Sequence, residues 1–167
     1  MNFLSLYLWI RKHLLKIDDR SQLEIAIANG LQIGKNCHIL GECIIDPGHC
    51  WLISIGDNVT LAPRVHVLAH DASTKRILGY TLIGRVTIGN NVFIGAGNVV
   101  SQSIPDNCVA LGSPARIICS YEEFIEKKKK LFSKSPRYSE EYVIGNITDE
   151  KKEQMIEDLS DKIGFVI

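Results

Sequence analysis

Aliphatic residues recur at every sixth position over residues 32–105, a spacing that fits neither a helix nor an open antiparallel sheet. A smaller apolar residue often follows four places later, as Val59 follows Ile55. The runs are Ile33, Ile39 and Ile45, then Ile55, Leu61 and Val67, then Leu82, Ile88, Ile94 and Val100. Two inward positions in six residues predict a short strand followed by a corner.

A fixed short period predicts a solenoid, in which each coil buries its apolar side by stacking on the next. Segments such as Gly56-Asp57-Asn58 suit its corners, because Gly and Asn tolerate unusual backbone angles. A β-sandwich is the alternative, but its turns are usually about eight to twelve residues apart. We therefore predict a mostly β chain with a solenoid over residues 31–119, a helical segment over residues 1–30 and a helical tail over residues 120–167.

Two interruptions of the period mark candidate functional faces, because a solenoid can extrude insertions at a corner without disturbing its stack. The first lies between Ile45 and Ile55 and contains Pro47-Gly48-His49-Cys50-Trp51. The second is a loop over residues 68–81 that begins with Leu68-Ala69-His70-Asp71.

Three segments carry a resemblance to a known family: Ile55-Gly-Asp-Asn-Val-Thr-Leu-Ala-Pro63, Val86-Thr-Ile-Gly-Asn-Asn-Val-Phe-Ile-Gly-Ala-Gly97 and Ile104-Pro-Asp-Asn-Cys-Val-Ala-Leu-Gly-Ser-Pro-Ala-Arg116. They resemble the bacterial hexapeptide-repeat acyltransferases, in the branch of the maltose, galactoside and capsular-sugar O-acetyltransferases. The resemblance implies a left-handed parallel β-helix of triangular section, with three hexads per coil, assembled as a homotrimer. It also implies transfer of an acetyl group from acetyl-CoA to a hydroxyl of a sugar or glycan precursor.

Such a transfer needs a general base for the hydroxyl proton, and histidine is the side chain that titrates naturally near neutral pH. Among the five histidines, His70 opens the second interruption, where the resembled family has its catalytic histidine. We predict His70 as the general base; a loop histidine without a role is the alternative. Asp71, the next residue, is predicted to orient the imidazole or to bind a sugar hydroxyl.

The first interruption supplies further candidates for substrate binding. Asp46 and His49 offer polar groups, and Trp51 offers an aromatic face for a sugar ring or for pantetheine. A buried plug at the coil corner is an equal alternative for Trp51, since large aromatic residues are mostly buried.

The resemblance also implies that coenzyme A lies in a groove between two subunits, against small residues and a phosphate-binding Arg. The residues carried over are Gly95, Ala96, Gly97, Ser101, Gly112, Ser113 and Arg116. The chain departs from the family's pattern in two ways. A whole coil is missing before Ile104, and Gln102 stands where a Lys is usual.

Composition and charge narrow the partners and the compartment. Nineteen basic residues balance nineteen acidic ones, so no bulk field favours nucleic acid. Five cysteines, without a C-x-x-C pair or an evident secretory signal, favour free thiols and a cytoplasmic location. The apolar run in residues 2–17 is too short to span a bilayer, which takes about twenty residues. Two interpretations stay open for it: a helix packed on the solenoid or on another subunit, and an interfacial helix with weak membrane-surface contact.

The C-terminal part predicts helices over residues 121–132 and 148–163, the second capped by Thr148, with a linker over residues 133–146. Lys127–Lys130 is interpreted as a solvated helix face.

Three rival functions stay open. N-acylation of an amino sugar needs the same base. A γ-type carbonic anhydrase needs three converging histidine ligands, and since His66 and His70 lack a placed third partner we predict no metal site. A non-catalytic trimeric β-helix scaffold is the third, because fold alone does not establish activity.

Overall fold

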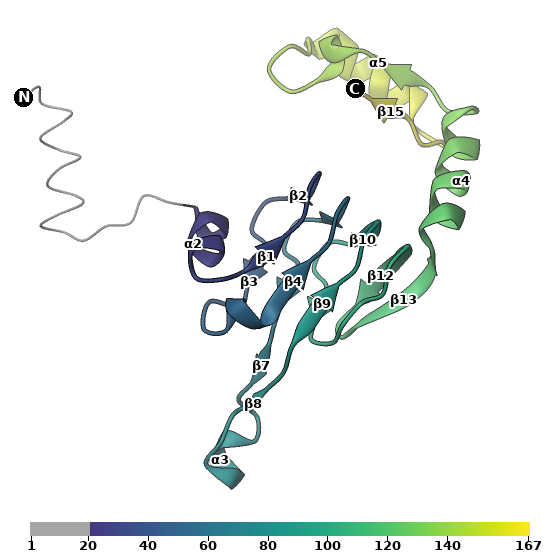
Figure 1. Ribbon diagram of the computed structural model, residues 1–167. Helices are drawn as coiled ribbons and strands as arrows, with labels where there is room; N and C mark the ends of the chain where they lie inside the picture. Colours follow the sequence, from purple (N-terminus) through teal and green to yellow (C-terminus); the bar gives the residue numbers. More distant parts are fainter. Residues whose placement is uncertain (1–20) are drawn as a thin grey trace, which may run out of the picture. The chain divides into compact units, whose positions relative to one another are not determined.

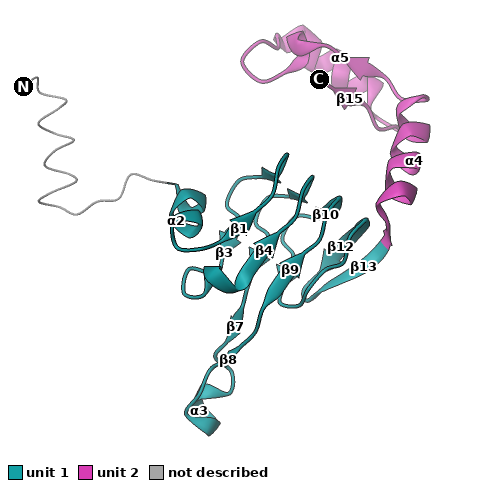
Figure 2. Cartoon of the chain, viewed as in Figure 1, with its two compact units in different colours: residues 1–118 teal, residues 119–167 magenta. Residues whose placement is uncertain are grey.

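The structure is a computed structural model that describes residues 21–167. The described chain divides after Ile118 into two compact units (Figure 2). The helix predicted over residues 2–17 lies outside the described residues. Within residues 21–167, none of the helices has the length and apolar character needed to cross a membrane.

Three sheets form the first unit, and their strands pair in parallel from one coil to the next (Figure 1). The chain passes through the sheets in the same order in each coil, and β13 adds a last strand beside β12. Sheet I contains β1 (Gln32–Ile33), β4 (Ile53–Ile55) and β9 (Val86–Ile88). Sheet II contains β2 (His38–Ile39), β5 (Thr60–Leu61), β10 (Val92–Ile94), β12 (Cys108–Gly112) and β13 (Ala115–Ser120). Sheet III contains β3 (Ile44–Ile45), β6 (His66–Val67) and β11 (Val99–Val100). The chain is therefore mostly β, as predicted.

Strand register confirms the phase of the hexads. Ile33 pairs with Ile55 and Ile55 with Ile88 in sheet I, and Ile104 forms a parallel bridge to Ile88. Equivalent corner positions are 22, 33 and 16 residues apart in successive coils, yet the inward aliphatic positions stay aligned. The three sheets thus keep their register although the connections between coils differ in length. Side chains from all three sheets form the core and are at most 2% exposed: Ile53, Val59, Leu61, Val65, Val67, Val86, Ile88, Val92, Ile94 and Val100.

The corner between sheets I and II is nearly identical in every coil. Its Asn residues have positive φ angles of 54–57°, a conformation that Asn tolerates better than most residues. Their side-chain amides form a ladder, in which Asn58 accepts from Asn36 at 3.2 Å and donates to Asn91 at 3.0 Å, and Asn91 donates to Asn107 at 2.8 Å. We call the residues Asn36, Asn58, Asn91 and Asn107 the asparagine ladder.

The second interruption forms an antiparallel hairpin that projects from the coils (Figure 1). It consists of β7 (His70–Asp71), α3 (Lys75–Leu78) and β8 (Leu82–Ile83). Leu82 was predicted to begin the third run of inward aliphatics, and that prediction is wrong: Leu82 pairs with Asp71 in the hairpin and is 62% exposed. The inserted segment therefore reaches beyond residue 81 to the start of β9.

Two short helical segments complete the first unit. Helix α2 (Gln22–Ala28) begins with a capping box, in which the Ser21 hydroxyl accepts from the Glu24 N–H and the Glu24 carboxylate accepts from the Ser21 N–H. The 3₁₀ helix η1 (Cys50–Leu52) lies in the first interruption, and α2 contacts both η1 and β3.

The second unit consists of α4 (Tyr121–Phe132), β14 (Arg137–Tyr138), η2 (Glu140–Tyr142), α5 (Asp149–Asp158) and β15 (Phe165–Val166). Helix α4 has the predicted bounds, and Thr148 caps α5 as predicted. The segment predicted as a linker contains β14, which pairs in parallel with β15. Helix α5 also ends five residues earlier than predicted, at Asp158.

Candidate active site

Both interruptions leave the stack at the same corner, the one that follows sheet III. The Asp46 N–H donates to Val67 at 2.8 Å, and the Leu68 N–H donates to Val100 at 2.9 Å, so the chain passes this corner in register in successive coils. The residues that follow, 47–52 in one coil and 69–85 in the next, are therefore neighbours. This stacking brings His49 and His70 together although they are far apart in the sequence.

His70 is held by a buried carboxylate. Its Nδ1 lies 2.5 Å from Oδ2 of Asp46, whose side chain is fully buried, while the His70 side chain is 34% exposed. A ring nitrogen facing a carboxylate carries the proton, which leaves Nε2 of the neutral imidazole as the acceptor. His70 thus has a fixed tautomer and an exposed edge, the two properties that a general base needs.

Asp46 differs from its predicted role in substrate binding. Its Oδ1 accepts from the N–H groups of Gly48 and His49 at 3.0 and 3.1 Å, and its Oδ2 accepts from the Ala69 N–H at 2.9 Å as well as from His70. Burial by itself raises the pKa of this carboxyl, but the hydrogen bonds from His70, Ala69 and Gly48 outweigh burial and hold the pKa below its ordinary value. Asp46 is therefore an ionised group facing the protein, with no surface left for a substrate.

His49 and Trp51 continue from His70 as a row of rings. The His49 ring centroid lies 5.1 Å from that of His70 and 5.3 Å from that of Trp51. Trp51 is 56% exposed, which contradicts the alternative of a buried plug and leaves an aromatic face open to solvent. The Nδ1 atom of His49 is buried without a hydrogen-bond partner among the described residues, 3.9 Å from Oδ1 of Asp46.

Asp71 forms its hydrogen bond with Ser73 rather than with the His70 ring. Its carboxylate accepts from the Ser73 N–H at 2.8 Å, and this hydrogen bond lowers the pKa of the Asp71 carboxyl. The partner that orients the imidazole is Asp46, 24 residues earlier in the chain.

A cavity of about 340 Å³ opens beside His70. Its walls come from both strands of the hairpin and from the end of the next coil: Leu68, Ala69, His70, Asp71, Leu82, Ile83, Gly84, Arg85, Val86, Ser101 and Gln102. The cavity therefore combines a histidine, a carboxylate, a guanidinium and apolar surface, which is typical of a small-molecule site.

Asp46, His49 and His70 also place one donor atom each within 4.8 Å of one another, so they are the group in the described chain that can hold a metal ion. The Asp46 oxygens, however, already accept four hydrogen bonds from the protein. That arrangement suits an oriented base better than a metal ligand set.

Comparisons with known proteins agree with the sequence pattern. The chain is 30% identical over 160 residues to Protein CapG of Staphylococcus aureus, an alignment that covers 80% of this chain and 93% of CapG. It is 32% identical over 112 residues to the galactoside O-acetyltransferase of Escherichia coli strain K12, covering 54% of each chain. The chain belongs to the hexapeptide-repeat acetyltransferase family. No family model matches it.

Solved acetyltransferase structures overlay only weakly on this member of the family. The maltose O-acetyltransferase of Clostridium difficile 630 has a TM-score of 0.37 and 25% identity, covering 69% of this chain and 88% of that one. So low a score carries no argument of its own, and the assignment depends on the sequence relatives.

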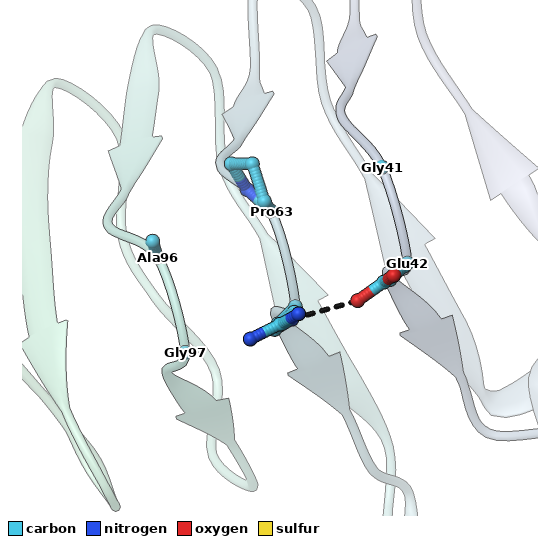
Figure 3. Close-up of a pocket in the computed structure, with 6 residues that line it drawn as sticks. Gly41, Glu42, Pro63, Ala96 and Gly97 are labelled. Carbon is cyan, nitrogen blue, oxygen red and sulfur yellow. Dashed lines mark hydrogen bonds and ion pairs between the residues drawn. The ribbon is translucent and has the colours of Figure 1, made fainter.

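The cofactor residues expected from the family are divided between two corners of this acetyltransferase. Ser101 lines the His70 cavity. Ala96 and Gly97 line a separate hollow of about 570 Å³ together with Gly41, Pro63 and an ion pair in which Arg64 Nε donates to Glu42 at 2.7 Å (Figure 3). Gly95 packs against Leu111, where a Cβ atom would lie 2.1 Å from its Cδ2.

The remaining cofactor candidates follow β12. The Gly112 N–H donates to the buried Asn98 side chain at 2.9 Å, Ser113 is exposed, and Arg116 donates to the carbonyl of Ala115 at 3.1 Å. The structure therefore does not gather the cofactor candidates around His70 within one chain.

Sequence reasoning missed two features of this site. Arg85 was placed in no role, although it lines the cavity, because the end of the hairpin was set at residue 81. The orienting role of Asp46 was missed because it depends on coil register: Ile45 stacks on Val67, so Asp46 falls beside Leu68 and within reach of His70.

Proposed function

We propose that this protein transfers the acetyl group of acetyl-CoA to a hydroxyl of a sugar or glycan precursor, with His70 as the general base. The observation that carries the proposal is the bond from Nδ1 of His70 to the buried Asp46 beside an open cavity. Family membership supports acyl transfer as the reaction class.

Acetyl-CoA supplies the acetyl group as a thioester. His70 takes the proton of the acceptor hydroxyl on Nε2 while that oxygen bonds to the thioester carbonyl carbon. As the carbon–sulfur bond breaks, the imidazolium returns the proton to the departing thiolate. Asp46 stabilises the imidazolium and keeps the ring in one tautomer, and backbone N–H groups stabilise the oxyanion.

The chain's small residues fit the cofactor. Gly41 and Gly97 line the second hollow, and a Cβ atom added at either would meet no other atom within 4 Å, so the backbone is accessible there. Arg116 offers a charge for a phosphate. Since Ser101 lies with His70 and Ala96 lies at the other corner, we propose a homotrimer of left-handed β-helices in which the two corners of neighbouring copies face each other across the cofactor.

For the acceptor, we propose that Trp51 stacks on the sugar ring, with His49 beside it. The exposure of Trp51 and its place in the row of rings that ends at His70 support this role. Aromatic faces suit the apolar faces of sugar rings.

Thiol release tests the proposal. Full-length protein is mixed with acetyl-CoA and a panel of sugars, amino sugars and nucleotide sugars, and free thiol is followed for wild type, His70→Ala and His38→Ala. His38 is the matched control, because it is exposed on β2. We expect turnover that falls by roughly 100-fold or more in His70→Ala, the scale of a general base, and persists in His38→Ala.

Product analysis separates the rivals. An O-acetyl ester is cleaved by hydroxylamine and an N-acetyl amide is not, so a resistant product would replace O-acylation with N-acylation. Absence of turnover on every acceptor, together with absence of coenzyme A binding by calorimetry, would favour the scaffold. Bound zinc together with CO₂ hydration would favour the anhydrase.

A further inference from the structure

Arg85 and His70 lie near each other at the base of the hairpin. His70 pairs with Ile83, and the Gly84 N–H donates to the Ala69 carbonyl at 2.9 Å, so the antiparallel ladder continues one residue beyond β8. Arg85 follows Gly84 directly and precedes β9, so it lies where the hairpin rejoins the coils. Arg85 and His70 both line the same cavity.

The guanidinium of Arg85 forms no ion pair within residues 21–167. The two nearby carboxylates already accept hydrogen bonds from other groups: Asp46 is buried and accepts four, and Asp71, which also lines the cavity, accepts from the Ser73 N–H. Arg85 is thus an exposed residue of the cavity wall whose charged guanidinium fork is unpaired. Such a fork matches the geometry of a carboxylate or a phosphate.

The position of Arg85 indicates whether its anionic partner belongs to acetyl-CoA or to the acceptor. In acetyl-CoA the whole pantetheine arm separates the thioester from the phosphates. With the thioester carbon at His70, those phosphates lie far from a residue that neighbours the base. An anion at Arg85 therefore belongs to the acceptor.

We propose that Arg85 determines specificity by binding an anionic group of the acceptor, so that the substrate is a sugar carrying a carboxylate or a phosphate. This inference rests on the proposed function, because it takes His70 as the point of reaction. Arg85 holds the acceptor so that a neighbouring hydroxyl meets Nε2 of His70. A neutral sugar lacks this contact and is a poorer substrate.

The test compares Arg85→Gln with Arg76→Gln. Arg76 is the matched control, because it lies on α3 of the same hairpin, is exposed and does not line the cavity. Steady-state rates are measured with neutral sugars, with uronic acids, and with sugar 1-phosphates and nucleotide sugars. The uronic acids and the phosphate compounds distinguish the two sources of the anion.

We expect wild type to prefer one anionic class. Arg85→Gln should raise the KM for that class by roughly 10- to 100-fold, the scale of a lost charge-assisted hydrogen bond, should raise the KM for neutral sugars much less, and should leave the KM for acetyl-CoA unchanged. Arg85→Lys should recover part of the loss, and Arg76→Gln should behave as wild type.

Equal losses on neutral and anionic acceptors, or a raised KM for acetyl-CoA alone, would overturn the inference. If no acceptor is turned over, calorimetric titration of the same acceptors onto wild type and Arg85→Gln tests the inference about Arg85. Anion binding that is lost in Arg85→Gln would support the role of Arg85 even though the proposed function had failed. Identical binding by both proteins would refute that role.

Discussion

Two corners of the same coils differ in regularity: one repeats in each coil, and the other carries a different insertion in each coil. The corner that carries the asparagine ladder repeats an Asn in the same backbone conformation in each coil, and the Asn side chains hydrogen-bond to one another. The corner after sheet III repeats nothing: it extrudes 3₁₀ helix η1 in one coil and a hairpin in the next, and it holds the buried Asp46 with His49 and His70. The regular corner fixes the register between coils. That register lets the irregular corner bring Asp46 and His70, which are 24 positions apart in the sequence, into hydrogen-bond contact.

The largest expected difference between the two corners is the effect of an Asp-to-Asn change on activity. Asp46→Asn places an amide beside Nδ1 of His70, which favours the wrong tautomer, and we expect kcat to fall by about 100- to 10,000-fold. Asp57 is the control, because its carboxylate accepts from the Lys35 N–H and Asn90 fills the same role one coil later. Asp57→Asn should keep full activity. Equal activity of the two variants would mean that the irregular corner is not catalytic.

A core truncation tests whether the stack or the hairpin holds the fold. Ile88 is fully buried and pairs with both Ile55 and Ile104, so Ile88→Ala should lower the free energy of unfolding by about 2–5 kcal/mol. Leu82→Ala, in the exposed hairpin, should change it by less than about 0.5 kcal/mol. Urea denaturation measures both. A large loss in Leu82→Ala would show that its exposed face is covered in solution.

The asparagine ladder should contribute to stability and nothing to turnover. Asn58→Ala places alanine, which does not favour positive φ, at φ 56°, and it removes two hydrogen bonds of the asparagine ladder. We therefore expect the free energy of unfolding to fall by about 1–2 kcal/mol. Asn58→Gly, which relieves the backbone strain, should lose less. Unchanged kcat in both variants is expected, and a drop in kcat without a drop in stability would contradict the division between corners.

The smallest expected effect is the pH dependence of stability that comes from Asp46. The pKa of Asp46 is lower in the folded chain than its ordinary value near 3.9, so the ionised carboxylate stabilises the fold above that value, and this stabilisation disappears as pH falls through the lowered pKa. Wild type should therefore be more stable than Asp46→Asn at pH 7, and the difference should shrink below about pH 4. The difference between the free energies of unfolding of the two proteins is measured at each pH, because the contributions of the other carboxylates cancel in it. A difference that grows in acid would contradict the role of Asp46 as an ionised partner.

The six-residue period predicted the coils because inward aliphatic side chains are a local requirement of every strand. It also marked the loop that begins near His70 as a candidate functional face, since an insertion is visible wherever the period fails, and the family resemblance then singled out His70 in it. It misplaced Leu82, whose hydrophobic character fits an inward position although it lies in an exposed hairpin. The partnership of Asp46 with His70 and the place of Arg85 depend on which residues leave the stack at one corner, and such contacts follow from register between coils rather than from local spacing.

The account depends most on His70 and Asp46 acting as one unit, and a double-mutant cycle on kcat/KM measures this directly. His70→Ala, Asp46→Asn and the double variant are compared with wild type under the same thiol-release assay. Once the base is gone its orienting carboxylate has nothing to orient, so the double variant should be no slower than His70→Ala. If Asp46→Asn reduced kcat/KM by its full factor in the His70→Ala background, the two residues would act independently and the oriented-base account would be wrong.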